Sequence, residues 1–140
     1  MELFFYHLGQ VNWVAVVVAV LPSFVIGSLW YNPNVVGNYW MKQVGLKPKD
    51  AEKANMVKAL SVTTAANLIA VTALATLLCA LQLRGILQGA VVGALLSFAF
   101  SGASRAVHLA FEQKSPGLFL VNTSHDVLFL ATAGAILGAF

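Results

Sequence analysis

The sequence predicts an all-α integral membrane protein, a four-helix bundle with one interfacial segment between the first two helices. Of the 140 residues, 59% are hydrophobic and only 9% are charged, whereas a soluble domain carries about a quarter charged residues. Each long apolar run has about 20 residues or more, enough to cross a hydrocarbon core about 30 Å thick at 1.5 Å per residue. No stretch remains for a soluble domain of about 50 residues. A single transmembrane domain is therefore expected over residues 1–140.

The first helix is expected over residues 11–31. Asn12 is a residue type that caps helices through its side-chain oxygen, which marks the start. Pro22 lies mid-way and predicts a kink, because proline removes one backbone hydrogen bond. Ser23 beside it can satisfy a freed backbone group. Pro33 ends the helix, since its predecessor is held away from helical geometry.

Residues 32–57 form the only sizeable segment predicted outside the membrane. Within it, residues 36–41 form an amphipathic stretch that is expected to lie along the interface, with Tyr39 and Trp40 at the level of the lipid headgroups. The sequence predicts a turn over residues 46–50 and, over residues 51–55, the lead-in to the second helix. The remaining helices are expected over residues 58–81, 86–111 and 117–140.

The distribution of basic residues predicts the orientation of the protein. Lysines gather in the loop between the first two helices, whereas the opposite side offers only Arg84. The positive-inside rule then places loop 32–57 in the cytoplasm and both termini outside, in what we expect to be a bacterial inner membrane. Most of the basic residues lie in or beside this one loop, a distribution that fits membrane topology better than nucleic-acid binding. The net charge of +3 therefore does not indicate a nucleic-acid partner. The lysines in question are Lys42, Lys47, Lys49 and Lys53, with Lys58 at the margin.

Small residues recur at every fourth position on three of the predicted helices. In a membrane, such ladders mark faces where helix backbones approach closely. Packing within the bundle and association with a second copy of the chain are both compatible with them, so the lipid bilayer and a homo-oligomer are the expected partners. The ladders comprise Gly85, Gly89, Gly93 and Ser97 on the third helix, Gly134 and Gly138 on the fourth, and Ala15, Ala19, Ser23 and Gly27 on the first.

Two polar clusters interrupt the last two apolar segments. Spacings of three and four residues place each cluster on one helical face. If the two helices form an antiparallel hairpin about Ser115, residues whose numbers sum to about 230 share a depth in the membrane. Arg105 is then level with Asp126, and His108 with Asn122. The clusters are Arg105, His108 and Glu112, and Asn122, His125 and Asp126.

Ionisable groups within a bilayer are costly and point to a functional site. Counting depth from the cytoplasmic side adds Asn67 of the second helix to this layer and places Trp30 and Tyr31 beneath it. Ser101 and Thr64 are expected at its edge. The predicted pocket therefore comprises Arg105, His108, Asn122, His125, Asp126 and Asn67, with a floor of Trp30 and Tyr31.

Three functions remain open for this pocket. The first is a binding or transport-like module for a small polar or anionic ligand, with Arg105 as the anion anchor and the histidines exchanging protons. The second is a structural lock in which Arg105 and Asp126 simply pair. The third is a metal- or haem-binding redox protein through His108 and His125, with Asp126 as a further metal ligand. No cofactor is expected under the first two.

Enzymatic catalysis has little support in the sequence. Ser124 adjoins His125, but neighbours on a helix point about 100° apart and do not form a nucleophile–base pair by adjacency. Cys79 is the only cysteine, which excludes a zinc cluster built from cysteines.

A short motif at the end of the first helix resembles a known family. Gly27-Ser28-Leu29-Trp30-Tyr31-Asn32-Pro33, followed by Gly37 and Trp40, is similar to the signature of family 1761 of domains of unknown function, small bacterial membrane proteins. Residues 119–140, with Asn122 and His125, are similar to that family's last helix. The resemblance implies four membrane helices. It implies no activity and no catalytic residues.

Overall fold

The computed structural model describes residues 1–47, 49–50 and 55–140 and confirms the all-α fold class. Four helical spans are long and apolar enough to cross a membrane. Their ends differ by two residues at most from the expected bounds. The spans are Trp13–Trp30, Met56–Ala80, Ile86–Glu112 and Pro116–Ala139.

The first span consists of two helices, α2 (Trp13–Val20) and α3 (Pro22–Trp30). Asn12 caps α2 as predicted, because its Oδ1 accepts hydrogen bonds from the backbone N–H groups of the second and third helical residues at 3.1 and 3.2 Å. The break falls at Pro22. Ser23 compensates there, since its buried hydroxyl donates to the carbonyl of Val20 at 2.7 Å.

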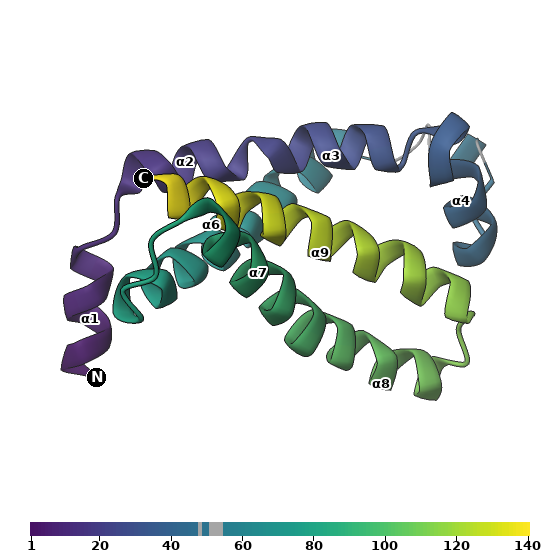
Figure 1. The fold of residues 1–140 in the computed structure, drawn as a ribbon. Helices are drawn as coiled ribbons and strands as arrows, with labels where there is room; N and C mark the ends of the chain where they lie inside the picture. The colour runs from purple at the N-terminus through teal and green to yellow at the C-terminus, as the bar shows by residue number, and fades with distance from the viewer. Residues whose placement is uncertain (48, 51–54) are drawn as a thin grey trace.

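A short helix that the sequence pattern did not reveal precedes this span. Helix α1 (Glu2–Gly9) lies against α6, at an angle to the bundle (Figure 1). Figure 1 also shows that the N and C ends of the chain lie at the same end of the bundle, whereas α4 lies at the other end.

The chain folds back after the first span through a π-helical turn, η1 (Pro33–Gly37), and the helix α4 (Asn38–Val44). Gly37 permits this reversal, because a Cβ at that position would overlap the carbonyl oxygen of Tyr31. As a result, α4 contacts α9. The predicted turn at 46–50 is present in its described residues, where Lys47 N–H donates to Asp50 Oδ2 at 3.0 Å. Pro48 and most of the predicted lead-in, residues 51–54, lie outside the described residues.

Helix α6 (Met56–Ala80) joins the bundle through its C-terminal half. Its buried residues lie between Val71 and Leu78, where α2, α6 and α9 enclose the apolar core. Its N-terminal half is largely exposed to the surroundings of the bundle. The core residues shared by these helices include Val16, Ala19, Val71, Phe129 and Ala133.

The last two spans form the predicted antiparallel hairpin. The third span consists of α7 (Ile86–Leu96), a π-helical segment η2 (Ser97–Gly102) and α8 (Ala103–Glu112). The fourth is α9 (Pro116–Ala139), which is capped by Ser115, whose Oγ accepts from the N–H of Gly117 at 3.0 Å. The π-helical segment was not predicted.

The glycine ladders of α7 and α9 pack against each other within the chain. A Cβ on Gly89 would overlap the carbonyl oxygen of Gly134, and one on Gly138 would overlap that of Gly85. The N–H of Gly85 also donates to the carbonyl of Gly138 at 2.8 Å. The surface that the sequence offered for a homo-oligomer is therefore occupied internally. Packing within the bundle, one of the two uses expected of these ladders, is what the structure shows for α7 and α9, and association with a second copy stays a prediction.

Candidate functional site

The centre of the site is an ion pair between the two helices of the hairpin. Arg105 Nη2 of α8 lies 2.5 Å from Asp126 Oδ2 of α9. Ser101 Oγ donates to the same oxygen at 2.9 Å. The predicted register of the hairpin is thus confirmed at Arg105, and Ser101 joins the layer as expected. The pair is only partly enclosed, since the side chains of Arg105 and Asp126 are 38% and 24% exposed.

His125 completes the contacts of this carboxylate. Its Nδ1 lies 3.1 Å from Asp126 Oδ1. Because an ionised carboxylate can only accept, a neutral imidazole in this contact carries its proton on Nδ1, and its Nε2 is then an acceptor. Nε2 is buried and has no hydrogen-bond partner among the described residues. Gly27 faces the ring, and a Cβ at this position would lie in ordinary van der Waals contact with Nε2, at 3.7 Å.

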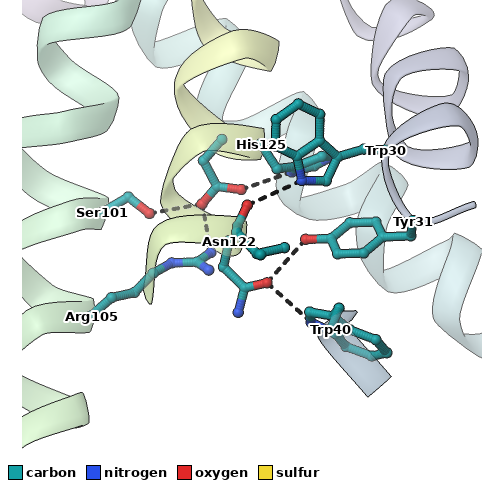
Figure 2. Close-up of polar contacts among 9 residues, drawn as sticks. Trp30, Tyr31, Trp40, Ser101, Arg105, Asn122 and His125 are labelled. Carbon is teal, nitrogen blue, oxygen red and sulfur yellow. Dashed lines mark hydrogen bonds and ion pairs between the residues drawn. The ribbon is translucent and has the colours of Figure 1, made fainter. Parts of the chain in front are cut away.

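Asn122 is held in one orientation by two aromatic side chains. Tyr31 Oη and Trp40 Nε1 both donate to Asn122 Oδ1, each at 3.1 Å (Figure 2). An indole N–H can only donate, so the amide oxygen must face the rings. The amide NH₂ group therefore points away from them, as Figure 2 shows.

The same aromatic residues attach the end of the first span to α9. Trp30 Nε1 donates to the carbonyl of Val121 at 3.1 Å. The Tyr31 ring packs edge-on against Trp40, with centroids 5.4 Å apart, and at a tilt against His125, with centroids 5.1 Å apart. Trp30 and Tyr31 thus border the site as predicted. The contribution of Trp40 was missed, because its amphipathic segment indicated only an interfacial position.

A cavity of about 120 Å³ opens between α8 and α9 beside the ion pair. We call it the Arg105 cavity. Its polar lining brings together residues from both predicted clusters and from the connecting loop. They are Arg105, His108, Glu112, Lys114 and Asn122.

His108 lies at this cavity but not beside His125, which corrects the sequence-based prediction. Its side chain is 72% exposed, and its Nδ1 lies 3.9 Å from Glu112 Oε1 on its own helix. Because it lies three residues further along the helix, its side chain is rotated by about 60° from that of Arg105. The proposed metal ligands His108, His125 and Asp126 therefore do not converge. Within the described ranges, no three His, Cys, Asp or Glu side chains are placed to hold a metal ion.

Asn67 and Thr64 also lie apart from the network. Thr64 Oγ1 donates to the carbonyl of Leu60 on its own helix at 2.7 Å, and no side-chain hydrogen bond connects Asn67 to the described site residues. The count of residues along each helix would have brought Asn67 and Thr64 to the site only if α6 packed against the bundle over its whole length. Its N-terminal half leaves the bundle before reaching the site.

Comparison with known proteins identifies the family. No curated protein and no solved structure matches this chain. A family model, described as a protein of unknown function (DUF1761), matches residues 14–138. The residues that suggested this resemblance lie together in the structure, where Trp30, Tyr31 and Trp40 bond to α9 and Gly27 faces His125. The chain belongs to the DUF1761 family, whose function is unknown.

Proposed function

We propose that this protein is a membrane binding or transport-like module that holds a small anionic ligand in the Arg105 cavity. The observation that supports this most directly is the orientation of Asn122. With its oxygen occupied by two aromatic donors, its NH₂ group is left for the cavity that it lines together with Arg105. Two neighbouring side chains thus offer unused donors to one space.

The balance of donors and acceptors favours an anion. A guanidinium carries five N–H donors, and in the described structure only Nη2 of Arg105 has a side-chain acceptor. Lys114 adds three more donors at the rim. Against these, Glu112 is the one carboxylate that lines the cavity among the described residues. A carboxylate, phosphate or sulfate group would match such a site, since charge-assisted hydrogen bonds to these groups are strong.

The size of the cavity restricts the ligand. A volume of about 120 Å³ corresponds to about four waters at roughly 30 Å³ each. The cavity therefore suits a small anion or the charged end of a larger molecule. In the orientation we propose, with loop 32–57 in the cytoplasm of a bacterial inner membrane, the ligand enters from the cytoplasm past Lys114.

A structural lock is the second candidate, and the contacts of Asp126 favour it. This carboxylate forms hydrogen bonds with Ser101, Arg105 and His125. Its negative charge therefore has partners without a ligand. The two candidates differ in the role of Asn122. A lock needs only its oxygen, whereas the binding site needs its NH₂ group.

Anion titration of the purified protein in lipid nanodiscs tests the proposal. Inorganic phosphate, sulfate and acetate are added while the ¹⁵N side-chain resonances of Arg105 and Asn122 are recorded. At least one anion is expected to shift both resonances saturably. Asn122→Asp keeps an oxygen for both aromatic donors but places a second, negatively charged oxygen in the cavity. We expect it to weaken binding by about tenfold or more, since hydrogen bonds to charged groups contribute about 1.5–3 kcal/mol.

Two further variants serve as controls. Ser124→Ala, at an exposed position of the same helix, should bind like the unmodified protein. Glu112→Gln removes the negative charge at the cavity and should tighten binding. If none of the three anions produces a saturable shift in the folded protein, the binding proposal is wrong and the lock is the better account.

A further inference from the structure

The Arg105 cavity is layered along the two helices that enclose it. On α8, its lining includes Arg105, Leu109 and Glu112, and residues three and four apart lie above one another on one helical face. On α9, which runs antiparallel, Asn122 and Leu118 are likewise four residues apart in the lining. The two donor side chains therefore lie at one level, an apolar layer follows one turn away, and the acidic side chain lies a further turn along.

The middle layer is apolar on both helices. Leu109 of α8 and Leu118 and Phe119 of α9 line the cavity, and all three are partly buried. The only other partly buried residues of the described lining are the two donors, Arg105 and Asn122. A ligand whose charged group meets these donors therefore has apolar side chains beside its remaining atoms.

The rim of the cavity is charged and exposed. The side chains of His108 and Glu112 are 72% and 56% exposed, and Lys114 is exposed as well. Glu112 and Lys114 carry opposite charges, so the rim offers little net attraction to a second anionic group on the same ligand.

The depth of the apolar layer limits the length of the ligand. One helical turn separates the donors from this layer and a second turn reaches the rim, at about 5.4 Å per turn. Carbon atoms bonded about 1.5 Å apart would fill one such turn with a chain of about three or four carbons. The cavity volume of about 120 Å³ agrees with a molecule of this size.

We propose that the ligand of this site is a monocarboxylate with a short apolar chain, its carboxylate at Arg105 and Asn122 and its chain against Leu109, Leu118 and Phe119. This inference rests on the proposed function and narrows it. Phosphate and sulfate carry oxygens on every side, and the oxygens facing the apolar layer would lose water without gaining a donor, which is costly. A carboxylate has its oxygens at one end only and leaves the rest of the molecule apolar.

A chain-length series tests the inference in the same nanodisc titration, with the ¹⁵N side-chain resonances of Arg105 and Asn122 as the readout. Formate, acetate, propionate and butyrate are added separately at a pH at which all four are ionised. Affinity should rise about threefold for each carbon that the apolar layer covers. The rise should stop at the rim, so hexanoate should bind about as tightly as butyrate. Butyramide, which has the same chain without the charge, should not shift either resonance.

Leu118→Ala and Leu120→Ala form a matched pair of variants on α9. Leu118 lines the cavity, whereas Leu120 is 61% exposed and lies outside the lining. Leu118→Ala should reduce the preference for butyrate over acetate from about tenfold to about threefold and leave the affinity for acetate unchanged. Leu120→Ala should keep the full preference. Circular dichroism checks the folding of both, and Leu109→Ala provides the same test from α8 if Leu118→Ala does not fold.

The outcomes separate this inference from the proposed function. If phosphate or sulfate binds while the carboxylates show no rise with chain length, the anion site stands and the short-chain monocarboxylate is wrong. Equal effects of Leu118→Ala and Leu120→Ala, or binding of butyramide as tight as that of butyrate, would overturn it too. A rise that continues to hexanoate would place the chain in the lipid instead of the cavity and would also contradict it. If no anion shifts the two resonances, the proposed function and this inference fail together.

Discussion

Asp126 is the side chain on which most polar contacts of the hairpin depend. Its carboxylate forms hydrogen bonds with Ser101 of η2, Arg105 of α8 and His125 of α9. Replacing one of its two oxygens by an NH₂ group leaves Arg105 without its charge partner. We expect Asp126→Asn to lower the free energy of unfolding by about 1–3 kcal/mol. This is less than the 3–5 kcal/mol typical of a fully buried pair, because Arg105 is partly exposed.

Unfolding of the detergent-solubilised protein by sodium dodecyl sulfate, followed by circular dichroism, measures this change. The double variant Arg105→Gln with Asp126→Asn should recover part of the loss, since it leaves no unpaired charge. Glu112→Gln is the control, because its 3.9 Å contact with His108 is exposed and contributes little. An effect of Asp126→Asn no larger than that of Glu112→Gln would contradict this role of the pair.

The site residues differ in how far they could be predicted. Arg105 and Asp126 were paired correctly because a short loop fixes the register of a hairpin, and register alone decides which residues share a depth. The sequence could not show the direction in which Asn122 points. That direction depends on Trp40, which is 82 residues away in the sequence and is brought to α9 only by the reversal at Gly37.

Among the helices, the contact of α7 with α9 determines how the hairpin is built. The backbones touch at their glycines, and Gly89 leaves no space for a methyl group against the carbonyl of Gly134. We expect Gly89→Ala to force the helices apart and to cost about 1–3 kcal/mol of unfolding free energy, the usual range for overpacking. The same unfolding assay measures it, and the ¹⁵N resonance of Arg105 should shift as the ion pair lengthens.

Gly9→Ala is the matched control for this substitution. It adds the same methyl group where no atom lies within 4 Å. Its unfolding free energy should stay the same or rise slightly, since alanine favours helix more than glycine does. If Gly89→Ala is as stable as Gly9→Ala, the close contact between the two ladders is not what holds the hairpin together.

The helices themselves were predictable, whereas their packing was not. Apolar runs of membrane length, a proline and polar breaks mark each span in the sequence, and the observed bounds follow them. The π-helical segment at Ser97–Gly102 leaves no such mark, because it changes the hydrogen-bonding pattern without changing composition. The departure of α6 from the bundle was equally hidden. It displaced Asn67 and Thr64 from a layer to which counting had assigned them.

For the bundle as a unit, the four spans place the two ends of the chain on one side and α4 on the other (Figure 1). Lys42 lies on α4, and Lys47 and Lys49 follow shortly after the end of this helix. They give the charge asymmetry from which we propose that this side faces the cytoplasm. The Arg105 cavity would then open toward the cytoplasmic face of the membrane.

Cysteine labelling of intact bacterial cells tests this orientation. The native thiol is first removed by Cys79→Ala, because Cys79 is only partly buried and lines a cavity of about 570 Å³. Glu2→Cys and Lys49→Cys are then introduced separately at exposed positions on the two sides. A membrane-impermeant maleimide should label Glu2→Cys in intact cells, but Lys49→Cys only after permeabilisation. The reverse pattern would place the Arg105 cavity on the outer side. An anion bound there would then be drawn from outside the cell, even though its contacts with Arg105 and Asn122 would be unchanged.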